Sequence, residues 1–511
     1  MSASLIIFQD TWNKKTWLSF LIFYLLILFF FSLKISINGL VIGGDSATYA
    51  SMAEQILHGN TPNSNVWNPG YPYLMAIFKY LFGGSILHAA KYLHVFLFCL
   101  NSLLFLFAIY QTEIRRPIWI FLFSLLLPIF TSYRTEAFSM MAELPFITFL
   151  LLFLLQFRGI QNKISTPKFL LIIITLLSLY FIKPNAIAFA IAMVIWVWLQ
   201  TWSTDVKWKY SAIFCFIFMA GVFAIKLSFG GYSGLQIQSA NSESVLTNLF
   251  AEFGNIGAVF NGFVINSNVY FKLKAYHYIW TLVYIFMVVS FITYYLKSRK
   301  ANSISASVSY SIIAIPLYVL IYLAVTTLSY PQVNPRTMLF PNILLLFCTI
   351  SLAAEFGIQC WQGKLLYAML LGFLVFGIGN KFLYSNPTLT DNVSHSLKHN
   401  HAVQYANQYL RQHPNTAIYC DVPKEAALFL NTSKVNALPG VQQWHGNEMV
   451  PINPDSLNVQ IKQFANGFCQ MKSGLVLIIQ TSESQNKNLN FPCEIQRIFL
   501  EDGIIYIAKS P

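Results

Sequence analysis

Residues 17–37 read WLSFLIFYLLILFFFSLKISI, an apolar run whose only charge is Lys34. A helix of about 20 residues crosses the roughly 30 Å of hydrocarbon in a bilayer, so this run is long enough to span a membrane. It also lacks the small-residue cleavage site that ends a secretory signal peptide. The run therefore predicts an uncleaved first membrane span, and with it an integral membrane protein.

Similar apolar runs continue through residues 1–380 and predict an all-α membrane domain of about eleven spans. Besides the first, they lie near residues 92–110, 117–132, 143–157, 168–182, 185–201, 210–228, 276–296, 308–329, 337–356 and 364–380. The composition agrees, because 56% of the residues are hydrophobic and only 10% are charged, whereas soluble domains carry about 25% charged residues. Residues 381–511 are predicted to form a separate soluble domain.

The net charge of +13 raises the alternative of a nucleic-acid-binding protein, so its position along the chain matters. Residues 382–511 contain nine Lys/Arg and nine Asp/Glu, which places the whole excess in the membrane domain. There the basic residues fall in alternate connections between predicted spans, as in cytoplasmic loops. They are Lys14, Lys15, Arg115, Arg116, Arg158, Lys163, Lys168, Lys207, Lys209, Lys297, Arg299, Lys300 and Lys364. The pattern argues against a nucleic-acid partner and predicts a cytoplasmic N-terminus with an extracytoplasmic C-terminal domain.

The C-terminal domain has the alternating pattern of a small α/β fold. Strand-like runs at 416–420, 474–480, 496–499 and 504–508 alternate with helical stretches at 398–411 and 456–466. Asp502-Gly503 is a hairpin turn signal before the last strand. The domain also contains Cys420, Cys469 and Cys493. In an oxidising compartment one disulfide is expected, and Cys469–Cys493 is the preferred pair.

The long outer loop 39–91 has the most distinctive sequence. GGDSATYASMAEQILHG (43–59) places apolar side chains on one face of a helix over 46–58, with Asp45 at its N-cap. WNPGYPYLMAIF (67–78) follows, with a Pro-Gly turn and a second helix. Both helices are predicted to lie along the membrane surface.

The other long outer loop, residues 229–275, begins with GGYSG at 230–234. Small flexible residues at the start of a loop suit a hinge. The loop is therefore predicted to act as a lid over the acceptor site.

The order of these features resembles the GT-C glycosyltransferases, specifically the branch that contains the protein O-mannosyltransferases and the aminoarabinose transferase of lipid A. The first outer loop looks like that family's Asp, interfacial helix and Pro-Gly-Tyr-Pro turn. Three segments follow in the family's order, SMMAELPFITFLL (139–151), YFIKPNAIAF (180–189) and NPRTMLFPNILLL (334–346). One departure is Ser46, where protein O-mannosyltransferases usually carry Glu. The resemblance covers roughly residues 1–380 and does not extend to the C-terminal domain.

The resemblance implies inverting transfer of a sugar from a polyprenyl-phosphate carrier to an extracytoplasmic acceptor, which is a lipid, a glycan or a protein. An acceptor hydroxyl needs a base, and Asp45 is the candidate, with Glu143 as a second acid that positions acceptor or donor. The departing phosphate needs cations, and Lys183 and Arg336 are the candidates. Two further candidates are Glu136 and Arg134.

Each candidate also has a plainer interpretation. Asp45 can cap the helix that follows it, a role compatible with catalysis, and Glu143 can be a solvated interfacial acid. The two cations can extend to lipid headgroups. His58 and His88 are isolated histidines rather than a set of metal ligands. No metal site and no cofactor are therefore predicted.

Two other functions compete with the transferase. A transporter or flippase would also need many spans, but transporters usually show internal repeats and helices broken at mid-membrane, and no repeat is found. A polymerase or ligase of lipid-linked glycans is closer in chemistry but lacks the first-loop arrangement. We expect a glycosyltransferase of the bacterial inner membrane whose partners are membrane lipids, a polyprenyl-phosphate sugar and an extracytoplasmic acceptor.

Overall fold

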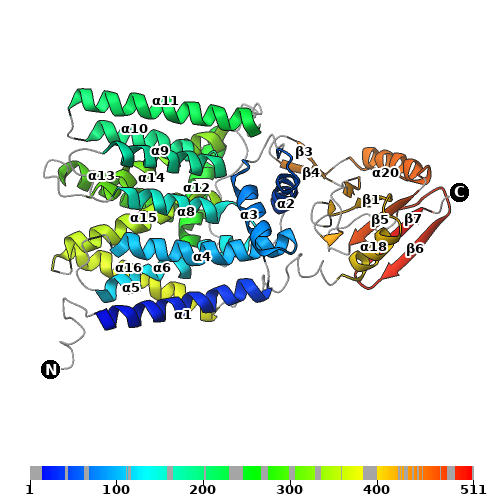
Figure 1. Ribbon diagram of the computed structural model, residues 1–511, viewed down its shortest axis with the longest axis horizontal. Coiled ribbons are helices and arrows are strands. Elements are labelled where there is room, and N and C mark those ends of the chain that lie inside the picture. The colour runs from blue at the N-terminus through cyan, green and yellow to red at the C-terminus, as the bar shows by residue number, and fades with distance from the viewer. Residues whose placement is uncertain are drawn as a thin grey trace. The chain divides into compact units, whose positions relative to one another are not determined.

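Figure 1 shows a computed structural model of the chain, which forms two compact units. The first consists of Met1–Ile37 and Ile56–Asn386, and the second of Asn38–Gln55 and Pro387–Pro511. The residues that the structure describes are 14–38, 40, 44–62, 68–110, 112, 117–157, 165–200, 203–229, 245–265, 274–298, 305–328, 335–357, 359–383, 400–423, 426, 429–430, 435–439, 442–445, 448–451, 453–471, 473–479 and 489–508. The first unit is helical, whereas both sheets belong to the second.

Each apolar run that the sequence predicts as a span corresponds to a helix or a group of short helices in the first unit. Its helices are α1 Lys14–Asn38, α3 Gly70–Phe82, α4 Ile86–Tyr110, α5 Pro117–Ser124, α6 Leu126–Ile129, α7 Thr131–Phe138, α8 Glu143–Gln156, α9 Thr166–Ile182, α10 Ala186–Leu199, α11 Thr204–Phe229, α12 Val245–Ile265, α13 Lys274–Ser298, α14 Ala306–Leu328, α15 Pro335–Phe356 and α16 Trp361–Leu383. Most of the long ones run side by side (Figure 1). α8 packs against α4 and α9, and α15 packs against α14 and α16.

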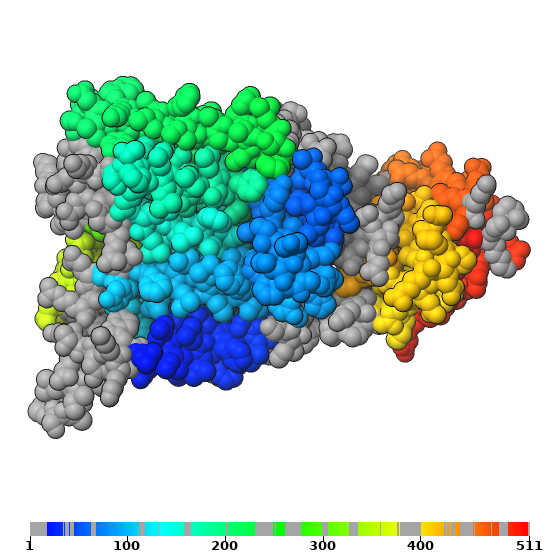
Figure 2. All heavy atoms as spheres, in the orientation of Figure 1, coloured from blue at the N-terminus to red at the C-terminus, as the bar shows by residue number. Residues whose placement is uncertain are grey.

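Five helices of the described chain, α4, α11, α13, α14 and α15, are long and apolar enough to cross a membrane. Ile118–Ile129 and Ser132–Phe138 would together make a sixth span, bent by 55°, and five further helices contain apolar segments of 10–17 residues. These features are those of a membrane protein, while the total of eleven spans stays a prediction. In α15, 89% of the apolar segment is buried, against 11% in α11. Accordingly, α11 (green) lies along the outer edge of the bundle in Figure 2.

Part of the loop that the sequence predicts as a lid is a helix. Val245–Ile265 form α12, which packs along α13 and also contacts α14, α15 and α16. Oγ1 of Thr281 in α13 donates a hydrogen bond of 2.7 Å to the carbonyl of Phe253 in α12. Residues 230–244 and 266–273 of the same loop lie outside the described residues, and the lid function stays a prediction.

The packing of α12 on α13 depends on Gly257. A Cβ atom there would lie 1.9 Å from the carbonyl oxygen of His277 and 2.4 Å from Oγ1 of Thr281. We expect Gly257→Ala to push the helices apart and to lower the free energy of unfolding by about 1–3 kcal/mol, as overpacking usually does. Denaturant unfolding in detergent micelles measures the change. Gly372→Ala is the matched control, because a Cβ there meets no atom within 4 Å; equal stability of the two variants would contradict the close packing.

The second unit contains a five-stranded sheet with the strand order β2-β1-β5-β7-β6. The strands are β1 Ala417–Cys420, β2 Val435–Ala437, β5 Gly474–Ile479, β6 Ile495–Leu500 and β7 Gly503–Ala508, and β3 Gln442–His445 pairs separately with β4 Glu448–Pro451. β2 and β5 run parallel to β1, while β6 and β7 form the hairpin predicted at Asp502-Gly503. With α18 His401–Gln412 and α20 Pro454–Cys469, this confirms a small C-terminal α/β fold.

Two local predictions are tested in the second unit. Cys469 and Cys493 form a disulfide, which is the preferred pair. The sequence predicts Asp45 at the N-cap, but α2 covers Gly44–Leu57, so Asp45 lies within the first turn of the helix. An acidic side chain in the first turn still interacts favourably with the helix dipole.

Candidate active site

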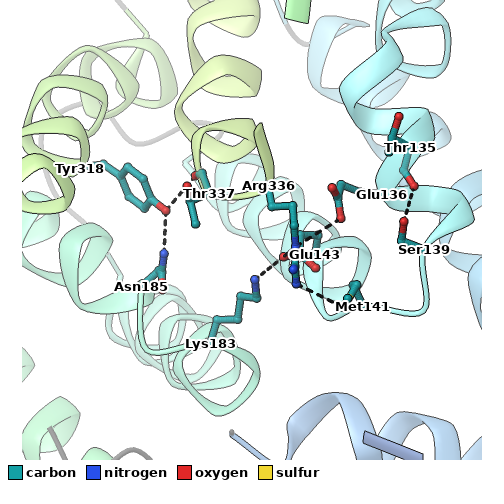
Figure 3. A network of polar contacts seen from close by, with 10 residues as sticks. All are labelled: Thr135, Glu136, Ser139, Met141, Glu143, Lys183, Asn185, Tyr318, Arg336 and Thr337. Atoms are coloured by element: carbon teal, nitrogen blue, oxygen red, sulfur yellow. Dashed lines mark hydrogen bonds and ion pairs between the residues drawn. The ribbon is translucent and has the colours of Figure 1, made fainter. Parts of the chain in front are cut away.

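Glu143 is the centre of a cluster of charged side chains in the first unit (Figure 3). Its Oε1 atom accepts hydrogen bonds from Nζ of Lys183 at 2.5 Å and from Nε of Arg336 at 3.1 Å. Nε of Arg336 also lies 3.8 Å from Oε2 of Glu136. Arg336 thus joins two carboxylates, one of which also holds Lys183. The structure brings together these four of the residues that the sequence singles out.

The cluster is built from helix ends, and proline places two of them. Arg336 follows Pro335 at the start of α15. Proline is favoured at the first position of a helix because an N–H there would have no hydrogen-bond partner within the helix. Lys183 ends α9 with an extended backbone, φ −148° and ψ 138°, because a residue before proline, here Pro184, is kept out of the helical region. Glu143 is the first residue of α8. Three helix ends therefore supply three of the four charged groups, and Glu136 comes from the last turn of α7.

Burial differs among the four side chains. Glu143 is 0% exposed and Glu136 6%, whereas Lys183 is 13% and Arg336 33% exposed. A carboxylate buried in an apolar bundle needs a cationic partner, and Glu143 has two. The acids form the buried side of the cluster and the cations its accessible side. This arrangement suits an anion, because Lys and Arg carry several N–H donors each.

A second hydrogen-bond network connects the neighbours of both cations (Figure 3). The hydroxyl of Tyr318, from α14, donates to the carbonyl oxygen of Thr337 at 3.0 Å and accepts from Nδ2 of Asn185 at 2.8 Å. Thr337 directly follows Arg336, and Asn185 lies two residues after Lys183. A single buried hydroxyl therefore ties the two cation-bearing segments together.

The Pro-Gly-Tyr-Pro turn of the first outer loop packs against the end of α9. Nδ2 of Asn68 donates a hydrogen bond to the carbonyl of Tyr180. A Cβ atom on Gly70 would lie 2.6 Å from the carbonyl oxygen of Phe181, so the close approach requires glycine. The turn thereby supports the segment that leads directly to Lys183.

Several residues in and around this cluster were not predicted from the sequence. Sδ of Met141 accepts a hydrogen bond of 3.2 Å from Nη2 of Arg336, and nothing in the sequence sets this methionine apart. His94 and Asn101 of α4 are buried in the same bundle. The sequence could have identified these two residues, because polar residues seven positions apart in an apolar run share one helical face.

The remaining predicted residues are placed as follows. Asp45 lies on α2, partly buried, in the segment that belongs to the second unit, and its role stays a prediction. Arg134 lies two residues before Glu136 on α7, and its role also stays a prediction. Within the part of the chain that the structure describes, no three His, Cys, Asp or Glu side chains are grouped as a metal ion would need. His88 shares a hydrogen bond with Ser85.

No family model matches the sequence, and no curated protein matches it. Among solved structures, the chain is similar to ArnT from Cupriavidus metallidurans bound to undecaprenyl phosphate, at 12% identity and a TM-score of 0.48, over 97% of this chain and 98% of ArnT. The apo state of that ArnT gives 13% identity and a TM-score of 0.45, over 96% and 98% of the two chains. Arabinofuranosyltransferase AftD from Mycobacteria gives 10% and 0.45, over 98% of this chain and 40% of AftD.

Proposed function

We propose that this protein is a membrane glycosyltransferase that transfers a sugar from a polyprenyl-phosphate donor to an extracytoplasmic lipid, glycan or protein. The observation that supports the proposal most directly is the convergence of Lys183 and Arg336 on the buried carboxylate of Glu143. Charged side chains inside an apolar bundle are costly and are retained mainly for function. Two cations held together there can receive the charge of a departing lipid phosphate.

Lys183 and Arg336 bind the donor phosphate in this proposal. Arg336 is the more exposed of the two, at 33%, and its planar guanidinium can bind two phosphate oxygens at once, while Lys183 acts as a point charge. Glu143 holds both cations when no phosphate is bound. Its negative charge offsets their mutual repulsion, which would otherwise be strong at such short range in an apolar environment.

Asp45 is the proposed base because of its place in the first-loop motif. Its carboxylate takes the proton of the acceptor hydroxyl, and the hydroxyl oxygen attacks the anomeric carbon of the sugar. The bond between that carbon and the phosphate oxygen breaks, and its electron pair leaves with the polyprenyl phosphate. Lys183 and Arg336 stabilise the negative charge that the leaving phosphate gains. Attack opposite the leaving group inverts the anomeric configuration.

An extracytoplasmic position of the C-terminal domain belongs to the same proposal. The Cys469–Cys493 disulfide supports it, because such bonds persist in oxidising compartments such as the bacterial periplasm. The basic residues in alternate connections between predicted spans support it as well. We therefore propose that the protein lies in the bacterial inner membrane and that its acceptor arrives from the outer side.

Mass spectrometry of envelope lipids, glycans and proteins from a strain that lacks this chain tests the proposed function. We expect one glycosylated species to lose one sugar, and the intact chain, supplied again, to restore it. Arg336→Ala should restore at most about a tenth of the product, because hydrogen bonds to charged groups contribute about 1.5–3 kcal/mol each.

Arg411→Ala is the control for this experiment, since Arg411 is an exposed arginine of α18 in the second unit. It should restore the product fully. An unchanged set of glycosylated molecules, together with altered uptake of a solute, would contradict the proposal and favour a transporter.

A further inference from the structure

Two of the fully buried polar side chains of α4, His94 and Asn101, lie seven residues apart and so share one helical face. Nδ2 of Asn101 donates a hydrogen bond of 3.0 Å to the carbonyl oxygen of Leu144. Its Oδ1 accepts one of 2.6 Å from the hydroxyl of Thr148. Because Leu144 directly follows Glu143, α4 holds the first turn of α8 next to the buried acid.

His94 makes the corresponding contact at the end of α7. Its Nδ1 lies 3.1 Å from the carbonyl oxygen of Ala137, the residue after Glu136. A carbonyl oxygen can only accept, so Nδ1 carries the hydrogen. Nε2 lies 2.7 Å from the hydroxyl of Tyr71 and, in the neutral ring, accepts the hydroxyl hydrogen. The last carbonyls of a helix lack partners within the helix, and His94 provides one for α7.

We infer that His94 and Asn101 position the phosphate-binding Arg336 without touching it, by fixing both ends of the corner that joins α7 to α8. This corner, residues 136–144, supplies three groups that contact Arg336: the carboxylates of Glu136 and Glu143 and the sulfur of Met141. α4 packs against both α7 and α8. His94 and Asn101 are positioning residues. That Arg336 binds a lipid phosphate rests on the proposed function.

Through Tyr71, the hydrogen bonds of His94 also reach the first outer loop. This residue directly follows Gly70, whose turn supports the segment leading to Lys183, and its hydroxyl binds His94. The Pro-Gly-Tyr-Pro turn is therefore connected to the segments of both cations. On the Lys183 side, Asn68 and Gly70 contact backbone carbonyls at the end of α9, and on the Arg336 side the connection runs through His94 and the corner.

Binding of two probes to the purified full-length protein in detergent tests the inference. The probes are decaprenyl phosphate and the neutral alcohol decaprenol. We expect Asn101→Leu to lower the affinity for the phosphate by about tenfold and to leave the affinity for the alcohol unchanged, because only the phosphate contacts the cations. Tyr71→Phe, which deletes one oxygen, should act in the same direction by about threefold, and it carries the test if Asn101→Leu does not fold.

Ser309→Ala is the matched control, because it also removes a buried hydrogen bond, of 2.8 Å from Nε1 of Trp196, elsewhere in the bundle. It should not change the preference for the phosphate probe. Equal losses of both probes in Asn101→Leu, or the same loss in Ser309→Ala, would indicate general destabilisation and overturn the inference.

Chemical modification of Arg336 by phenylglyoxal, followed by mass spectrometry, gives a readout that needs no lipid. Asn101→Leu should raise the modification rate several-fold, because Arg336 is released from the corner, and Ser309→Ala should not. An unchanged rate in Asn101→Leu would also overturn the positioning role. If the modification rate rises in Asn101→Leu but even the chain without any substitution binds no decaprenyl phosphate, the proposed function fails while the positioning role stands.

Discussion

Glu143→Leu is expected to lower the free energy of unfolding by about 3–5 kcal/mol, as removal of one partner from a buried ion pair does. Glu143 is 0% exposed, and its Oε1 contacts both Lys183 and Arg336. Leucine fills a similar volume without charge, so both cations would be left without this counter-charge inside an apolar bundle. Unfolding by denaturant in mixed micelles measures the change.

Glu143→Gln separates the charge of this side chain from its shape. Glutamine keeps an oxygen that accepts from Lys183 and Arg336. Oε2 of Glu143 has no hydrogen-bond partner in the described structure, so an amide nitrogen there breaks no bond. We expect a stability between those of the unmodified chain and Glu143→Leu. Asp205→Leu, at an exposed position in α11, is the surface control; if it destabilises as much as Glu143→Leu, Glu143 is not the shared counter-ion.

The members of this cluster could be predicted from the sequence, but their pairing could not. Glu143, Lys183 and Arg336 each stand at the end of an apolar run, where a charged side chain is unusual enough to be noticed. That one carboxylate receives both cations depends on which helix ends meet, and this is decided by the packing of α8, α9 and α15. The contact between Met141 and Arg336 depends on the same packing.

The fold, too, could be predicted from the sequence only where a local pattern determines it. The length of the apolar runs was enough to place most helices of the membrane domain, and turn chemistry was enough for the β6–β7 hairpin. α12 was missed because Glu252, Gly254 and Gly257 interrupt its apolar pattern and glycine lowers helix propensity. β2, β3 and β4 have only three or four residues each, too few for a period to be recognised. The grouping of Asn38–Gln55 with the C-terminal residues depends on contacts far apart in sequence.

Asp45→Asn is expected to reduce the product of the proposed transfer by about 10²–10⁴-fold, the usual contribution of a general base, without preventing membrane insertion or folding. Asparagine has nearly the shape of aspartate and is accepted at the start of a helix, but it cannot take the proton of an acceptor hydroxyl. Loss of the charge weakens the interaction with the dipole of α2 by only about 0.3–1 kcal/mol. The measurement is product formed per unit time after the variant is induced in the deletion strain, at matched protein level.

Two variants of the same helix make this experiment specific for the base. Asp45→Glu keeps a carboxylate and should retain part of the activity, reduced because the longer side chain displaces the oxygen that takes the proton. Glu54→Gln removes the other acid of α2 and should leave the rate unchanged, because general base catalysis requires contact with the reacting hydroxyl. Full product formation by Asp45→Asn would remove Asp45 as the base while leaving the cations on Glu143 as the proposed phosphate site. In that case the proton would have to pass to another group, and Glu136, the more exposed of the two acids beside Arg336, would be the next residue to replace.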